Sequence, residues 1–200
     1  MLPLLGSIYN SLNSHSTNPI ILLTKFDSKV PFLPIFILPY LFWYGFVLGY
    51  LIYFCFKDTK VFVKTLTVMV VGEVVCFVIY FFFQTTVPRP KLEGNSFLIE
   101  LVQLIYSRDL PYNCFPSIHV LTSLAIMLGY LHLKIKHILH SIFIYITGTM
   151  IIISTLFVKQ HVILDIFGAL MLTLLTYGIV FELFHFSKLS KKEHTVYLKD

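Results

Sequence analysis

The sequence of 200 residues is poor in charge: only 12% of its residues are Asp, Glu, Lys or Arg, whereas 57% are hydrophobic. Soluble domains contain about 25% charged residues, so half that share leaves too little polar surface to cover a water-soluble globule. The apolar residues also fall in long blocks, as a chain that faces lipid requires. The composition therefore excludes a soluble domain and indicates an integral membrane protein.

Paired cysteines and metal-binding spacings are also missing. Cys55 and Cys76 lie inside apolar blocks, and Cys114 stands alone in a polar loop, without the CxxC or Cys/His spacing typical of zinc sites. We therefore expect no disulfide, no metal and no cofactor. The apolar stretch after Met1 lacks the basic leader and cleavage site of a signal peptide, and we expect it to be mature sequence.

The net charge of +5 comes from lysines in short clusters beside apolar blocks. This pattern is typical of topology signals in membrane proteins, not of a nucleic-acid-binding surface. The expected partners are therefore membrane lipids and no nucleic acid, and the sequence is silent on the oligomeric state.

The apolar blocks predict an all-α fold, a polytopic transmembrane helix bundle of about five spans with an N-terminal interfacial helix. A helix needs roughly 20 residues to cross about 30 Å of hydrocarbon. Residues 1–33 are expected to form the interfacial segment, 34–187 the transmembrane bundle with the candidate site, and 188–200 a cytoplasmic tail. The five expected spans are Pro34–Phe56, Val61–Phe83, Ser117–Leu133 (the shortest), Ile138–Val158 and Val162–Phe184. A helix that lies on the surface is expected over Phe97–Tyr106, within the long polar loop Gln84–Pro116.

The lysine clusters predict which side of the membrane each connection faces. With five spans, the three clusters fall on one side, which the positive-inside rule assigns to the cytoplasm. The loop 84–116, the turn 158–162 and the N-terminus are then expected on the extracytoplasmic side of the cell membrane. The clusters are Lys57, Lys60 and Lys64, then Lys134 and Lys136, then Lys188, Lys191 and Lys192.

Three polar segments are expected to converge on that extracytoplasmic face. They are Thr85-Thr86-Val87-Pro88-Arg89-Pro90, Phe115-Pro116-Ser117-Ile118-His119, and the stretch from Ser154-Thr155 through Lys159-Gln160-His161 to Asp165. Charged groups at this depth are costly unless they are paired or reach water. The coincidence of so many of them at one level therefore predicts a functional site.

The spacing of His161 and Asp165 predicts the chemistry of that site. Residues at i and i+4 share a helix face, so the carboxylate can accept the Nδ1 proton and leave Nε2 free as a nucleophile or base. His119, in the first turn of a helix that Ser117 can cap, is the available proton donor for a departing oxygen. The alternative for the His161–Asp165 pair is a helix-end pair that only stabilises the bundle.

Fixed positive charge suited to phosphoryl oxygens is expected from Arg89 and Lys159. Ser117, at a helix N-terminus with unpaired N–H groups, is a third candidate for phosphate binding. The arrangement needs no metal. The alternatives are that Arg89 and Lys159 only reach the membrane interface and that Ser117 only caps its helix.

These residues resemble the type-2 phosphatidic acid phosphatase superfamily, whose motifs are Lys-x6-Arg-Pro, Pro-Ser-Gly-His and Ser-Arg-x5-His-x3-Asp. Arg89-Pro90 matches the end of the first motif, Pro116-Ser117 with His119 the second, and Ser154, His161 and Asp165 the third. The resemblance implies that His161 forms a phosphohistidine, that Asp165 orients it, and that His119 protonates the leaving group without a divalent metal.

The sequence departs from these motifs at three positions: Phe82 stands in place of Lys, Ile118 in place of Gly, and Thr155 in place of Arg. Lys159 is a candidate to replace one of the missing cations. In this form the motifs look more like the branch that contains inositol phosphorylceramide synthases, whose members can transfer the phosphoryl group to an alcohol.

Three functions follow in order of preference. The first is a metal-independent phosphatase for lipid phosphates or lipid diphosphates, and the second is a phosphotransferase that uses the same mechanism with an alcohol acceptor. The third is a non-catalytic transporter or scaffold, although neither an internal repeat nor a broken helix is evident. Glu73, in the middle of the second span, belongs to no motif, and we expect it to have a protonated or hydrogen-bonded interhelical role in preference to a catalytic one. Arg108, Asp109, Tyr112 and Asn113 are candidates for shaping substrate entry.

Overall fold

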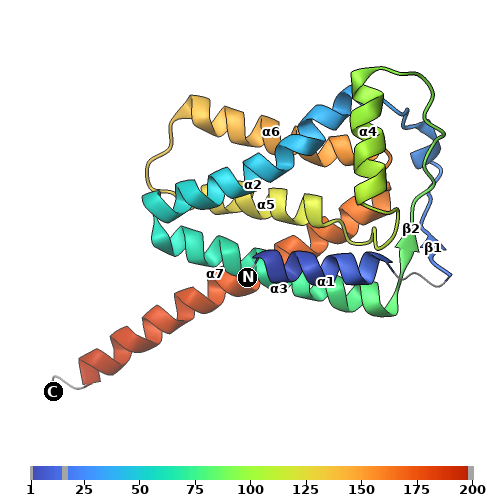
Figure 1. Ribbon diagram of the computed structural model, residues 1–200. Coiled ribbons are helices and arrows are strands. Elements are labelled where there is room, and N and C mark those ends of the chain that lie inside the picture. Colours follow the sequence, from blue (N-terminus) through green and yellow to red (C-terminus); the bar gives the residue numbers. More distant parts are fainter. Residues whose placement is uncertain (1, 15–17, 198–200) are drawn as a thin grey trace.

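The computed structural model describes residues 2–14 and 18–197, with side chains for 6–9, 11–13 and 18–181. Its helices are α1 (Leu2–Ser14), α2 (Ile37–Lys57), α3 (Thr59–Phe82), α4 (Phe97–Arg108), α5 (Ile118–Tyr130), α6 (Ile138–Phe157) and α7 (Ile163–Tyr197). Two short 3-10 helices, η1 (Asp27–Lys29) and η2 (Pro34–Phe36), precede α2. The elements form one helix bundle, and the expectation of an all-α membrane fold is confirmed (Figure 1).

Four helices are long and apolar enough to cross a bilayer: Pro34–Lys57, Thr59–Phe82, Ile138–Phe157 and Ile163–Phe181. Their exposed faces carry large apolar side chains at helical spacing, as lipid contact requires. On α7, for example, Phe167, Met171, Leu174 and Leu175 are exposed. Four of the five expected spans therefore have spanning length.

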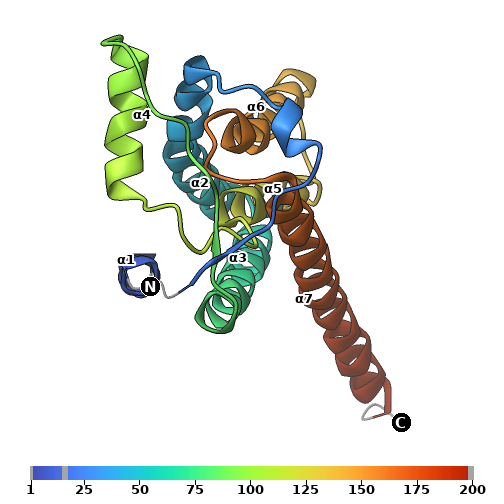
Figure 2. The ribbon, with the colours of Figure 1, turned by 90° about the vertical axis from the view of Figure 1, so that its right-hand side faces the viewer.

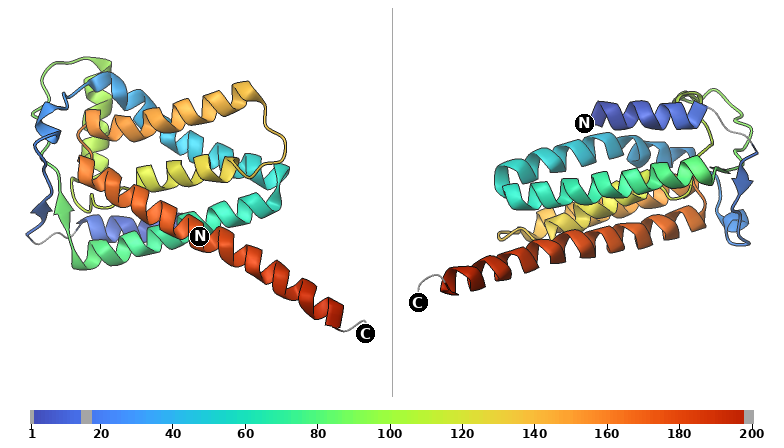
Figure 3. Two further views of the ribbon diagram at one scale, coloured as in Figure 1. Left: turned by 180° about the vertical axis from the view of Figure 1, so that it is seen from behind. Right: turned by 90° about the horizontal axis from the view of Figure 1, so that it is seen from below.

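The remaining expected span, Ser117–Leu133, is shorter than predicted. Helix α5 has 13 residues and rises only about 20 Å. It packs against α2, α3, α6 and α7, and none of its residues is exposed. Because neighbouring helices surround it, α5 has no exposed face for lipid. Pro116 and Ser117 before it are buried as well, whereas the turn that follows it is exposed, with Leu131 at 49%. The centre of the bundle can therefore be shorter than its rim (Figure 3).

Polar caps fix where several helices begin. The Asp58 carboxylate accepts from the backbone N–H groups of Lys60 and Val61 at the start of α3, and Ser96 accepts from Ile99 at the start of α4. Ser117 caps α5 in the same way. These side chains satisfy N–H groups that have no partner within their own helix.

Helix α4 lies across one end of the bundle, which we call the site end (Figure 2). The surface helix expected at Phe97–Tyr106 is thus present and two residues longer. Helix α1 runs beside α3 along the bundle axis (Figure 1), and its expected position at the membrane interface stays a prediction. At the site end, β1 (Ile20–Ile21) and β2 (Thr85–Thr86) form a parallel pair that the sequence did not predict.

At the other end of the chain, α7 continues to Tyr197 beyond its apolar part. Residues 188–197 of the expected tail therefore continue this helix. The side chains of Lys188, Lys191 and Lys192 lie outside the described part, so their expected contribution to topology stays a prediction.

Candidate active site

His161 and Asp165 meet at the start of α7. The His161 Nδ1 atom lies 3.2 Å from Asp165 Oδ2, and the backbone N–H of Val162 donates to the same oxygen at 2.9 Å. Asp165 is completely buried, so its carboxylate is shielded from water. When it accepts the Nδ1 proton, the neutral imidazole presents an unprotonated Nε2. The pair can therefore supply a nucleophile or a base.

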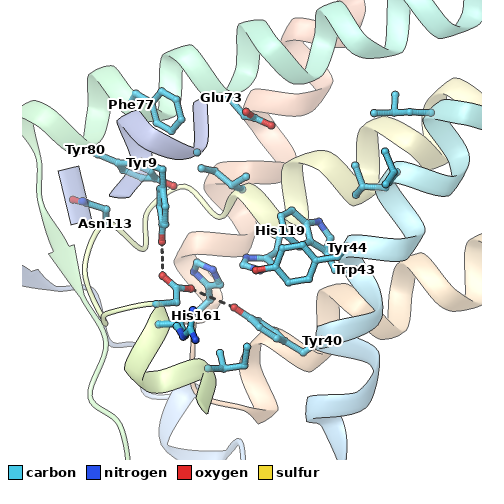
Figure 4. A pocket seen from close by; sticks show the side chains of 18 residues that line it. Tyr9, Tyr40, Trp43, Tyr44, Glu73, Phe77, Tyr80, Asn113, His119 and His161 are labelled. Atoms are coloured by element: carbon cyan, nitrogen blue, oxygen red, sulfur yellow. Dashed lines mark hydrogen bonds between the residues drawn. The ribbon is translucent and has the colours of Figure 1, made fainter. Parts of the chain in front are cut away.

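His119 lies next to His161, and their ring centroids are 5.8 Å apart. Its ring is held between Tyr40 and Trp43, at centroid distances of 4.6 and 4.3 Å (Figure 4). Trp43 is itself fixed, because its Nε1–H donates to Thr122 Oγ1 at 2.8 Å. The buried Nε2 of His119 has no hydrogen-bond partner within the described part of the chain. Such a nitrogen requires a partner that a ligand can provide.

Both histidines line a pocket of about 510 Å³ (Figure 4). Aromatic and aliphatic side chains dominate its wall, and two of those on α2, Tyr44 and Leu48, are 60% and 53% exposed. The pocket therefore borders the lipid-facing side of the bundle. A site with an apolar wall and two histidines suits an amphiphile with a small polar group. The lining residues are Gly6, Tyr9, Tyr40, Trp43, Tyr44, Val47, Leu48, Leu51, Glu73, Phe77, Tyr80, Ile105, Arg108, Asp109, Asn113, Ile118, His119 and His161.

Arg89 organises the loops around the histidines. Its guanidinium donates to the carbonyl oxygens of Tyr106 (3.1 Å) and Asp109 (2.7 Å) and to the side-chain oxygen of Gln160, the residue before His161. Burial lowers the pKa of this guanidinium, and the nearby Asp109 opposes that effect. Arg89 does not line the pocket, so its expected contact with phosphate stays a prediction.

Lys159 and Ser117 also have partners within the protein. The Lys159 ammonium donates to the carbonyl oxygens of Val30 (2.5 Å) and Asp27 (3.4 Å), which lie before α2. Ser117 is completely buried and caps α5, and its own N–H donates to the carbonyl oxygen of Asp165. Neither residue lines the pocket. Their expected roles in phosphate binding are untested.

Of the three positions that depart from the motifs, Ile118 lines the pocket, whereas Phe82 and Thr155 do not. Phe82 is 80% exposed at the end of α3. Thr155 is buried, and its carbonyl oxygen accepts from the N–H groups of Gln160 and His161 at 3.0 and 3.1 Å. Of the eighteen lining residues, only Arg108 carries a permanent positive charge. Arg108 is therefore a cationic candidate that the motifs alone do not identify.

Cys114 is a neighbour of the histidine–aspartate pair that its isolated sequence position did not reveal. Potential ligand atoms of Cys114, His161 and Asp165 all lie within 4.8 Å of one another. Burial raises the pKa of the Cys114 thiol, and the charge of Asp165 adds to this effect. The expectation of a site without a metal stays a prediction.

Asp109 joins α1 to the wall of the pocket. Its carboxylate accepts from the Tyr9 hydroxyl at 2.7 Å and from the Asn13 amide at 3.2 Å, and the Tyr40 hydroxyl lies 3.5 Å away. The sequence marked Asp109 as a candidate for shaping substrate entry. The sequence did not indicate these three partners, which come from α1 and α2; Tyr9 and Tyr40 are seen in Figure 4.

Comparison with known proteins is consistent with this geometry. Neither curated proteins nor solved structures give a match to the chain. The family model of the PAP2 superfamily, in contrast, matches residues 61–188, which is more than half of the chain and includes Arg89, His119, His161 and Asp165. Members of this superfamily act as phosphatases or phosphotransferases on phosphate esters. The chain is an integral membrane protein and belongs to the PAP2 superfamily.

Proposed function

We propose that this protein is a lipid-phosphate phosphatase that works through a phosphohistidine on His161. The observation that carries the proposal is the placement of two histidines on one pocket, one of them bonded to a buried carboxylate through Nδ1. The apolar wall suits a substrate whose tail stays in the lipid while its phosphate reaches the histidines.

In the first step, Nε2 of His161 attacks phosphorus and the bond from phosphorus to the ester oxygen breaks. His119, in its protonated form, gives its proton to the departing alkoxide. Asp165 stabilises the positive charge that develops on the His161 ring. In the second step, His119 takes a proton from water, and the resulting hydroxide attacks the phosphohistidine to release inorganic phosphate and free His161.

Replacement of the nucleophile tests the proposal most directly. Purified protein should release phosphate from a long-chain alkyl phosphate in the presence of EDTA, since no step uses a metal. His161→Ala should abolish this release. The matched control is His137→Ala, because His137 is exposed at the opposite end of the bundle. Full activity in His161→Ala would refute the proposal.

The role of His119 as an acid can be separated from a purely structural role. A nitrophenyl phosphate has a leaving group that needs no protonation, so His119→Ala should lose much less activity on it than on an alkyl phosphate. A collapsed pocket would lose both activities equally. Addition of an alcohol distinguishes hydrolysis from transfer, since label that appears only in free phosphate identifies a phosphatase.

The site is proposed to face the extracytoplasmic side, as the lysine clusters suggest. Lys91 is exposed in the loop between β2 and α4, whereas Lys134 is exposed in the turn between α5 and α6. An impermeant amine reagent added to intact cells should therefore label Lys91 and not Lys134. Labelling of Lys134 alone would reverse the proposed orientation.

A further inference from the structure

Glu73 is a buried acid for which the proposed mechanism has no use. It lies on α3 and is only 8% exposed, and its side chain extends into the same pocket as His119 and His161 (Figure 4). Among the side chains that the structure describes, none forms a hydrogen bond or an ion pair with Glu73. The expected interhelical hydrogen bond is therefore not formed within that part of the chain.

The depth of Glu73 follows from how α3 and α5 run past each other. Thr65 lies against Gly129, Gly72 lies against Leu121, and the Tyr80 hydroxyl donates to the carbonyl oxygen of Pro116. The two helices are thus antiparallel, and Glu73 lies level with Leu121. Leu121 is two residues beyond His119 along α5, which corresponds to a rise of about 3 Å. Glu73 therefore lies slightly deeper in the bundle than the histidines.

The surroundings of Glu73 give its carboxyl group little compensation. Helices α2 and α3 contribute the apolar side chains of Val47, Leu48, Leu51 and Phe77 to the pocket wall, and apart from Glu73 its other residues from these helices are aromatic: Tyr40, Trp43, Tyr44 and Tyr80. An unpaired carboxyl group beside such side chains costs free energy in either protonation state. Carboxyl groups at this depth therefore usually have a partner. Within the pocket, that partner has to come from the ligand or from water.

We propose that Glu73 is a specificity-determining residue that accepts a hydrogen bond from a hydroxyl or amine on the substrate, next to the phosphate-bearing carbon. The inference rests on the proposed function, because it takes the phosphate to lie at the histidines. A donor two or three bonds from the ester oxygen then lies slightly deeper, at the level of Glu73. A substrate without this donor leaves the carboxyl group unpaired, which makes its binding less favourable.

Three substrates with the same chain test this inference: hexadecyl phosphate, 2-hydroxyhexadecyl phosphate and 2-aminohexadecyl phosphate. The full-length wild-type protein should show a kcat/KM about 10- to 100-fold higher for at least one donor-bearing substrate than for hexadecyl phosphate. In Glu73→Leu this preference should disappear while hexadecyl phosphate is still hydrolysed. For a hydroxyl donor, Glu73→Gln should keep part of the preference, because its amide oxygen still accepts a hydrogen bond.

The substrates also identify the donor. A preference for the amine alone, lost in both variants, supports recognition of a cation by an ionised Glu73. A preference for the hydroxyl that Glu73→Gln retains supports a neutral hydrogen bond. The matched control is Glu100→Gln, since Glu100 is an exposed acid on α4 and its replacement should leave all three rates unchanged.

An unchanged preference in Glu73→Leu, or equal rates of the wild type on all three substrates, would overturn the inference. So would an equal change in all three rates, which would identify Glu73 as a site for water or as a purely structural residue. Failure of the proposed function gives a different result. In that case the wild type hydrolyses none of the three phosphates.

Discussion

The two ends of the bundle both carry histidines, yet they surround them with different partners. At the site end, His161 binds a buried carboxylate through Nδ1, and His119 has an unpaired Nε2 beside the pocket. At the opposite end, the Nε2 atoms of His132 and His140 are bonded to the hydroxyls of Tyr177 and Tyr50. One end leaves ring nitrogens available to a ligand, and the other occupies them.

The partner determines what a histidine can do. A carboxylate accepts the proton of one ring nitrogen and stabilises the charged ring, which makes the other nitrogen more basic. A tyrosine hydroxyl can donate to the ring and thereby block the nitrogen that would react. In addition, burial and the charges of Lys64 and Lys136 lower the pKa of His132. The Tyr177 hydroxyl and these charges therefore both disfavour a protonated His132 ring.

Replacement of the histidine's hydrogen-bond partner should have its largest effect at the site end, where the partner is a carboxylate. Asp165→Asn keeps the size of the side chain but offers an N–H group to Nδ1, which favours the wrong tautomer of His161. We expect kcat to fall by about 10²- to 10⁴-fold. The measurement is phosphate release under saturating substrate.

The corresponding change at the opposite end is Tyr177→Phe, which removes the partner of His132. Its activity should stay within about twofold of the wild type, since surface changes away from a site have small effects. An equal loss in both variants would mean that the histidine partners serve only the stability of the bundle.

Substitution of Arg89 should have the next largest effect on activity, and it should also affect stability. Arg89→Met leaves three acceptors without their donor, two backbone carbonyls and the Gln160 side chain. Each unsatisfied acceptor that stays buried costs about 1–3 kcal/mol, so the unfolding temperature in detergent should fall. Because Gln160 precedes His161, kcat should also fall, by about 10-fold or more.

Arg89→Lys is the informative companion. A single ammonium cannot reproduce the planar fork of donors, so it should recover little of the stability. If Arg89→Lys restored both stability and kcat, positive charge at phosphate would be the main role of this residue, as the sequence predicted.

The sequence predicted the all-α membrane fold and the location of most helices because lipid imposes long apolar blocks that composition reveals directly. It overestimated the length of α5, since an apolar helix surrounded by other helices needs no spanning length. The pairing of His161 with Asp165 could be predicted because i, i+4 spacing is local. The contacts of Tyr40 and Trp43 with the His119 ring could not be predicted. Tyr40 and Trp43 are far from His119 in the sequence, and aromatic residues are common on lipid-facing helices.

The sequence also could not show which basic residues are available to bind phosphate. A motif specifies which residue type stands where, but not which carbonyl oxygens already surround it. Lys159 lies within the third motif, between Ser154 and His161, and was predicted to bind phosphate, whereas its ammonium donates to the carbonyl oxygens of Asp27 and Val30. Arg108 belongs to no motif, yet it lines the pocket. Arg108 reaches the pocket because α4 packs over the site end, and this packing cannot be read from the sequence.

Substitutions of Arg108 and Lys159 should have the smallest effects, mainly on KM. Arg108 is exposed at the pocket, so Arg108→Gln should raise KM about fivefold, as the loss of about 1 kcal/mol from a solvent-exposed charge pair implies, and high salt should reduce this difference. Lys159→Gln should leave KM within about twofold and instead increase protease cleavage near Asp27 and Val30, because their carbonyl oxygens lose a donor. Salt-dependent KM measurements and limited proteolysis on both variants decide the assignment. A large increase of KM in Lys159→Gln alone would identify Lys159 as the phosphate-binding cation. Its ammonium would then have to leave the carbonyl oxygens of Asp27 and Val30 when substrate binds.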